Sequence, residues 1–135
     1  MKQGESSDRE QIVDLLARLA HATDEGTLDE YAACFSEDAS LALPGAEPTK
    51  GRDNMVASSK ARRASGGVGP GSRTRHLVST TTVQVSGDSA TSSSYVAFYG
   101  MEAAGPVVKG VLTYNDSFRR TATGWLLCER KIKPA

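Results

Sequence analysis

The stretch GSRTRHLVSTTTVQV, residues 71–85, marks the point where the chain changes from helical to β-strand periodicity. Its second half alternates β-branched and polar residues, a pattern typical of a half-buried strand. The stretch begins, however, with two arginines and with His76, one of only two histidines in the chain. The pattern predicts a strand over residues 74–85, and His76 is a candidate either for a catalytic base or for a polar residue at a strand end.

Three further alternating segments follow, at residues 90–101, 107–120 and 125–132. They are joined by the short turns SGDS, EAAGP and TATG. Short turns of this kind favour antiparallel neighbours. The second half of the chain therefore predicts a four-strand antiparallel meander.

The first half of the chain has helical periodicity instead. Residues 7–24 predict a helix with Ser7 or Asp8 as N-cap, Asp24 at the margin of its apolar stripe and His21 on its outer side. The stripe consists of Ile12, Leu15, Leu16, Leu19 and Thr23. After the break at Gly26, residues 28–35 predict a short helix, 40–43 a short strand and 52–64 a third helix. The order predicts an α+β domain whose three helices pack on one face of a curved, mainly antiparallel sheet.

A Gly-rich segment, SGGVGPGS at residues 65–72, separates the third predicted helix from the first long strand. Its four glycines and one proline prevent a regular element. The segment lacks the spacing and the strand-to-helix setting of a phosphate-binding loop. We interpret it as a mobile loop at the rim of a pocket.

The composition narrows the class of partner. The 135 residues predict a single domain over the whole chain, and 16 basic residues balance 16 acidic ones. This balance gives no broad basic surface for nucleic acid or an anionic membrane. No membrane span or secretory signal is recognisable, so we expect a cytoplasmic protein that binds a small molecule or another protein. Cys34 and Cys128 have neither disulfide nor metal-binding spacing, so we expect buried free thiols and no metal.

Strand alternation suggests which residues face a pocket. In the first long strand His76 shares its face with Val78, Thr80 and Thr82. In the last strand Arg130 shares its face with Cys128, among apolar neighbours, where a guanidinium needs an anionic or polar partner such as Glu47 or Asp116.

Aromatic and methionine side chains repeat on the two middle strands. Tyr95 and Met101 share one face of their strand, and Tyr114 shares a face of the next strand with Asp116. These side chains are candidates either for the core or for ligand contacts, and for Asp116 we favour an ion pair with an arginine.

The order of five stretches resembles the SnoaL-like branch of the NTF2-like superfamily. These stretches are HATDEGTLDEYAACFSEDA at the end of the first helix, KGRDNM, TRHLVSTTTVQVSGDSA, YNDSF and TGWLLCERKI. The resemblance covers nearly the whole chain. It implies a cone-shaped α+β barrel in which helices and a strongly curved sheet enclose a deep pocket. The fold hosts both enzymes and binding proteins, so the activity has to be argued from residues.

The resemblance also implies roles for particular residues. Asp24 and His76 match the aspartate and histidine that form the catalytic pair in scytalone dehydratase and hexachlorocyclohexane dehydrochlorinase. Arg130, five residues after Trp125, matches a pocket arginine of the dehydrochlorinase. Leu19, Leu43 and Met101 stand where relatives carry other catalytic groups, which argues against steroid isomerisation or scytalone dehydration.

Two hypotheses follow. The first is a cofactor-independent lyase or isomerase that acts on a small carbonyl or hydroxylated metabolite, and it includes polyketide cyclisation. In this hypothesis His76 is the base, Asp24 its orienting partner and Arg130 the anion stabiliser. The second is a small-molecule-binding protein without catalysis. In both, the predicted ligand contacts are Leu19, Leu43, Val78, Tyr95, Met101, Tyr114 and Cys128. A homodimer through the outer face of the sheet, with Leu77, Val83 and Val85, is also expected.

Overall fold

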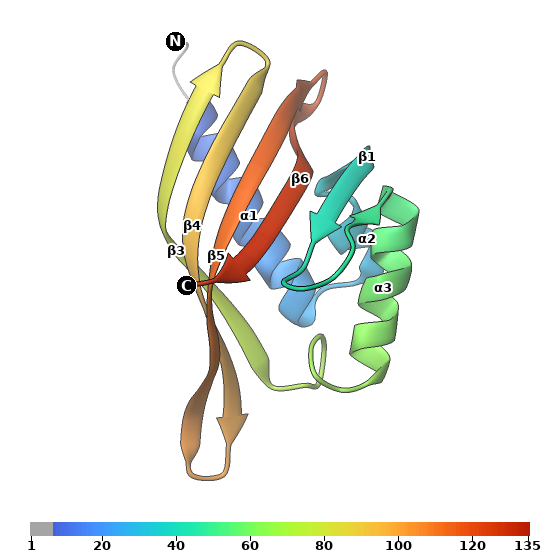
Figure 1. Ribbon diagram of the computed structural model, residues 1–135, viewed down its shortest axis with the longest axis vertical. Coiled ribbons are helices and arrows are strands. Elements are labelled where there is room, and N and C mark those ends of the chain that lie inside the picture. The colour runs from blue at the N-terminus through green and yellow to red at the C-terminus, as the bar shows by residue number, and fades with distance from the viewer. Residues whose placement is uncertain (1–6) are drawn as a thin grey trace.

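The computed structural model describes residues 7–135 as three helices packed on one six-stranded sheet (Figure 1). The helices are α1 (Asp8–Glu25), α2 (Leu28–Ala32) and α3 (Arg52–Ala64). The strands are β1 (Phe35–Ala42), β2 (Thr49–Lys50), β3 (Thr74–Ser86), β4 (Ser89–Glu102), β5 (Gly105–Thr121) and β6 (Gly124–Pro134). Their order in the sheet is β2-β1-β6-β5-β4-β3, and all neighbours are antiparallel except β1 and β6.

The predicted fold class is confirmed, and four details differ. The two-residue strand β2 was not predicted. The sheet is open, because β2 and β3 are its two edges, so it does not close into a barrel. The short helix ends at Ala32 rather than at residue 35. The first strand begins at Phe35 rather than at Ser40 because it joins β6 in parallel, and such a distant pairing leaves no mark in the local pattern.

The helices begin and end where side chains satisfy their terminal backbone groups. Ser7 caps α1 by accepting a hydrogen bond from the backbone N–H of Glu10, and Thr27 and Glu30 form a capping box on α2. At the C-terminal end of α1, Arg63 of α3 donates to the carbonyls of Ala22 and Gly26 over 2.8 and 2.6 Å. This contact ties α3 to the end of α1, where Asp24 lies.

The core lies between α1 and the inner face of the sheet, the face that the helices cover in Figure 1. The α1 stripe is buried as predicted from Ile12 to Leu19, and Ala22 and Asp24 continue it. Burial of this stripe places the end of α1 against β3. The position of Asp24 therefore follows from the packing of the whole helix.

A bulge in β3 corrects the predicted face assignment. The register with β4 shifts between Ser79 and Thr82, and Thr80 has a φ of 52°. A bulge inserts one residue and reverses the alternation beyond it. Thr80 and Thr82 are therefore exposed, whereas Val83, expected on the outer face, packs against the core.

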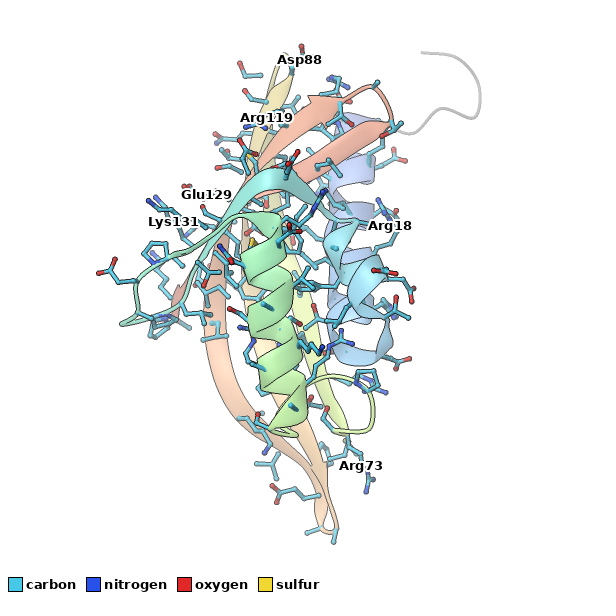
Figure 2. All side chains as sticks on the ribbon, turned by 90° about the vertical axis from the view of Figure 1, so that its right-hand side faces the viewer. Arg18, Arg73, Asp88, Arg119, Glu129 and Lys131 are labelled. Atoms are coloured by element: carbon cyan, nitrogen blue, oxygen red, sulfur yellow. The ribbon has the colours of Figure 1, made fainter. Side chains whose placement is uncertain are left out.

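A second bulge lies in β6 and reverses the alternation of side chains along that strand. Ser117 pairs with Glu129 but Phe118 pairs with Leu127, so Cys128 is left out of the ladder. Trp125, Leu127, Arg130 and Ile132 consequently all contribute to the inner side. Figure 2 shows Glu129 and Lys131 on the side of the sheet that faces away from the helices.

The outer face of the sheet carries exposed apolar side chains. They include Leu77, Tyr95, Met101, Val108 and Val111, which are between 44% and 59% exposed. The β4–β5 hairpin extends beyond the body of the sheet in Figure 1. Within residues 7–135, no helix is both long enough and apolar enough to cross a membrane.

Candidate active site

A cavity of about 390 Å³ lies between the inner face of the sheet, α2, α3 and the Gly-rich segment. Most of its wall is apolar. It is lined by Thr23, Tyr31, Phe35, Leu41, Leu43, Pro44, Ser59, Arg62, Ser65, Gly67, Val68, His76, Phe98, Leu112, Tyr114, Arg130 and Ile132. Because Ser65, Gly67 and Val68 belong to the Gly-rich segment, that segment lies at the wall of the cavity, as the sequence indicated.

Asp24 and His76 meet at one side of this cavity. Nδ1 of His76 lies 2.6 Å from Oδ1 of Asp24, and the backbone N–H of His76 donates to Oδ2 over 3.0 Å. The carboxylate therefore holds both the ring and the backbone of the histidine. An Nδ1–H tautomer fits this contact and leaves Nε2 as the unprotonated nitrogen.

Phe98 of β4 completes the setting of the histidine ring. His76 and Phe98 are cross-strand partners, and their ring centroids are 4.5 Å apart. A contact of this kind restricts the rotation of the imidazole. The histidine is thus held by a carboxylate on one nitrogen and an aromatic ring against its face.

Arg130 and Asp116 form a buried ion pair in the same interior. Nε and Nη2 of Arg130 donate to the two carboxylate oxygens over 2.8 and 2.9 Å, and the guanidinium lies 4.0 Å from the centre of the Tyr114 ring. Burial lowers the pKa of Arg130, but Asp116 outweighs it and the net pKa is raised, so the side chain stays charged. Of the partners considered from sequence, Asp116 is the one found. Neither hydrogen bond uses Nη1.

Two buried tyrosines add neutral donors to the wall. Burial raises the pKa of both Tyr31 and Tyr114 above the usual value for a phenol. Both hydroxyl groups are therefore protonated at neutral pH. They can donate hydrogen bonds to a ligand without contributing a charge.

The other predicted ligand contacts divide into two groups. Leu43 and Tyr114 line the cavity. Leu19 is 1% exposed within the core, and Val78 lines a separate groove beside α1, so neither lines the cavity. The predicted placement of Tyr95 and Met101 is wrong, because both lie on the exposed outer face of the sheet.

Cys128 is also misplaced by the prediction. It is the bulged residue of β6, and its thiol donates to the Ser117 carbonyl instead of lining the cavity. Burial raises the pKa of both Cys34 and Cys128, which keeps these free thiols protonated. Within residues 7–135, no group of three His, Cys, Asp or Glu side chains is arranged to hold a metal ion.

Sequence reasoning missed Tyr31, Arg62 and Phe98 as cavity residues. Tyr31 lies on the inner side of a helix, a position that is typical of core packing. Phe98 could have been found from the register, since the hairpin turn at residues 86–89 brings it opposite His76 once the β3 bulge is counted. Arg62 has no local signal, because a basic residue near the end of a helix is common for electrostatic reasons alone.

These features define an NTF2-like α+β domain with a largely apolar pocket. The model of the SnoaL-like domain matches residues 4–131, and the chain belongs to this family. No curated protein matches the chain in sequence.

Solved structures with the same fold come from several bacteria. An NTF2-like protein with a cystatin-like fold from Novosphingobium aromaticivorans is 28% identical, with a TM-score of 0.78 over 94% of this chain and 81% of that one. A Catenulispora acidiphila protein in complex with S-DNPA is 22% identical, with a TM-score of 0.80 over 93% and 92%. A candidate dehydratase of the NTF2-like family from Streptomyces avermitilis is 18% identical, with a TM-score of 0.80 over 95% and 97%.

Proposed function

We propose that the cavity is the active site of a cofactor-independent lyase or isomerase of the dehydratase, eliminase or cyclase type. In this proposal, His76 removes a proton from a small, largely apolar carbonyl or hydroxylated metabolite. The observation that carries it is the 2.6 Å contact between His76 Nδ1 and Asp24 Oδ1 at the wall of an apolar cavity. The ligand-bound protein and the candidate dehydratase with the same fold support a small-molecule substrate.

The base would be Nε2 of His76. When Nε2 takes a proton, the ring becomes an imidazolium, and the carboxylate of Asp24 stabilises that charge through Nδ1–H. A positioned general base supplies roughly 10² to 10⁴ in rate. Asp24 is a positioning residue in this scheme, since it acts on the substrate only through His76.

Arg130 would stabilise the charge that appears on the substrate. Removing a proton next to a carbonyl produces an enolate, whose oxygen needs a hydrogen-bond donor in a water-poor site. Nη1 of Arg130 is not engaged by Asp116 and is available for this contact. Because Asp116 balances its charge, Arg130 acts as an oriented N–H donor rather than as a free cation.

The enolate then has three outcomes that need no redox partner. Loss of a leaving group from the β-carbon gives elimination, and reprotonation at another carbon gives isomerisation. Attack on a second carbonyl gives ring closure. In each case His76 returns its proton to the leaving group, the carbon or the new alkoxide.

The competing function is small-molecule binding without turnover. Two features favour it. The wall is mostly apolar, and Leu43 stands where the family resemblance places a catalytic carboxylate. A binding protein needs only the shape and apolar surface of the cavity. The Asp24–His76 contact would then serve stability alone.

Proton exchange in D₂O separates the two functions without knowledge of the natural substrate. The probes are the bicyclic ketones 1-indanone and 2-tetralone, whose α-protons are followed by ¹H NMR. The wild type should accelerate exchange, and His76→Ala should lose at least about 10²-fold of that acceleration. His21→Ala, which removes the exposed histidine of α1, is the matched control and should behave as the wild type.

Binding and folding are measured on the same samples. The circular dichroism melt must show that His76→Ala is folded. If both proteins bind the ketones equally and neither accelerates exchange, the lyase or isomerase reading is abandoned in favour of binding alone.

The outer face of the sheet supports a homodimer as the assembly. Leu77 and Val111 both flank Ala97 through the strand register, and exposed Tyr95 lies on the same face. An apolar surface shared by adjacent strands favours association with a second copy. Sedimentation velocity of the wild type and of Leu77→Arg distinguishes a dimer through this face from a monomer.

A further inference from the structure

Arg62 is a cavity residue that the proposed reaction does not use. It lies in the last turn of α3, and its side chain lines the same cavity as His76. The α3 helix packs against β1, whereas His76 belongs to β3 at the opposite edge of the sheet (Figure 1). The two side chains therefore reach the cavity from different walls.

The charge of Arg62 is not balanced by a carboxylate of the described chain. Arg130 is paired with Asp116, and His76 contacts Asp24. In contrast, Arg62 forms no ion pair within residues 7–135. No Asp or Glu oxygen of this part of the chain lies within 4.0 Å of its guanidinium nitrogens. A cation at an apolar cavity wall loses hydration and gains when an anion enters.

Tyr31 places a second donor beside Arg62. Tyr31 lines the same cavity as Arg62, the charge of Arg62 acts on the Tyr31 phenol, and Tyr31 is only 4% exposed. Burial raises the pKa of this phenol, so it remains a neutral O–H donor. A guanidinium has N–H donors and no acceptor, so the two side chains together offer an acceptor group several hydrogen bonds.

We infer that Arg62 and Tyr31 form an anion-binding subsite of the cavity, and that its ligand is a small organic acid with one carboxylate and an apolar body. The apolar body is accommodated by Phe35, Leu112 and Ile132, which line the same cavity. A volume of about 390 Å³ lies at the small end of ligand sites. The inference adds a substrate class to the proposed active site. Its statement about the reaction rests on the proposed function, whereas its statement about ligand binding does not.

An acid and its amide test the subsite, because they have nearly the same shape and differ in charge. The probes are 2-naphthylacetate and 2-naphthylacetamide, titrated by isothermal calorimetry. The wild type should bind the acid at least about 10-fold more tightly than the amide, since hydrogen bonds between charged partners are stronger than those to a neutral group. Arg62→Gln should abolish this preference without weakening the amide.

Lys60→Gln is the matched control, since it removes one positive charge from the exposed side of the same helix. It should retain the preference for the acid, and Tyr31→Phe should reduce the preference only in part. Equal affinity of the wild type for acid and amide, or an unchanged preference in Arg62→Gln, would overturn the inference.

His76→Ala separates this inference from the proposed reaction. The variant should keep the preference for the acid even if the ketone exchange assay shows no catalysis by the wild type. Loss of the acid preference in His76→Ala but not in Arg62→Gln would place the anion site at the histidine and would also overturn the inference.

Discussion

Two buried aspartates, Asp24 and Asp116, hold their partners in similar ways but with different consequences. They are 4% and 2% exposed, and each accepts two hydrogen bonds from one residue. The partner of Asp116 is an arginine, which is always charged, whereas the partner of Asp24 is a histidine, whose ring nitrogens can either donate or accept a hydrogen bond. The first pair is a fixed ion pair of the interior, and the second contains a side chain of the kind that serves in proton transfer.

The geometry of the two pairs matches this difference. Asp116 and Arg130 face each other on adjacent antiparallel strands, so the sheet register alone brings them together. Asp24 reaches His76 from the end of α1, across 52 residues of sequence. It engages a single ring nitrogen and leaves the other unbound. The second arrangement therefore leaves one ring nitrogen of a cavity-lining residue without a carboxylate partner.

The largest effect should follow from breaking the fixed pair. Asp116→Ala leaves the guanidinium of Arg130 buried without its counter-ion, so the free energy of unfolding should fall by about 3 to 5 kcal/mol. Urea denaturation measures this change. The double variant Asp116→Leu with Arg130→Met should recover most of the loss, since a buried pair replaced by apolar residues is often neutral. If Asp116→Ala is no more destabilised than Asp24→Asn, the two pairs do not differ as argued.

Asp24→Asn should have an intermediate effect on stability. It should have a large effect on the rate of any proton transfer. The amide oxygen can still accept one of the two hydrogen bonds, so the cost should be about 1 to 3 kcal/mol in urea denaturation. Exchange of the ketone α-protons should fall by about 10²-fold or more, because the ring is no longer held as the Nδ1–H tautomer. A variant with normal exchange would assign Asp24 to stability alone.

The smallest change in stability should come from replacing the exposed carboxylates Asp8 and Asp38. They provide a reference for the buried carboxylates Asp24 and Asp116. Hydrogen bonds from Arg120 and Arg119 lower the pKa of Asp8 and Asp38 below the usual value. Because the folded pKa is the lower one, their contribution is present above about pH 4 and is lost as the pH falls through the folded pKa. Thermal melts from pH 2 to 6 should show a shallower acid-side decline for Asp8→Asn and Asp38→Asn than for the wild type.

Salt provides the control for this reference. The two surface pairs are exposed to solvent, so 0.5 M NaCl should reduce their effect. The buried pairs should respond much less. If thermal stability falls identically toward low pH in the wild type and in both variants, Asp8 and Asp38 do not contribute to the pH dependence of stability.

Helix α3 was predicted with its observed bounds, and the four long strands to within two residues, because local periodicity and turn residues fix such elements. The positions of Asp24 and His76 were recognisable from a family resemblance, and the structure brings the two side chains into contact. Their catalytic roles remain predictions. The apolar stripe of α1 and the Ser7 cap also follow from local sequence.

The sequence by itself determined α1, α3 and the four long strands, their order and the presence of a histidine at the start of the first long strand. Only the tertiary structure decided which strand residues point inward, because one extra residue at Thr80 or at Cys128 reverses every later side chain. It also decided that Arg62 and Tyr31 line the same cavity as His76, since they come together only when α3 packs against the sheet. The local sequence predicts side-chain direction along a strand only as far as the next bulge. Contact between elements distant in sequence depends on the packing of the whole chain and cannot be predicted from local sequence.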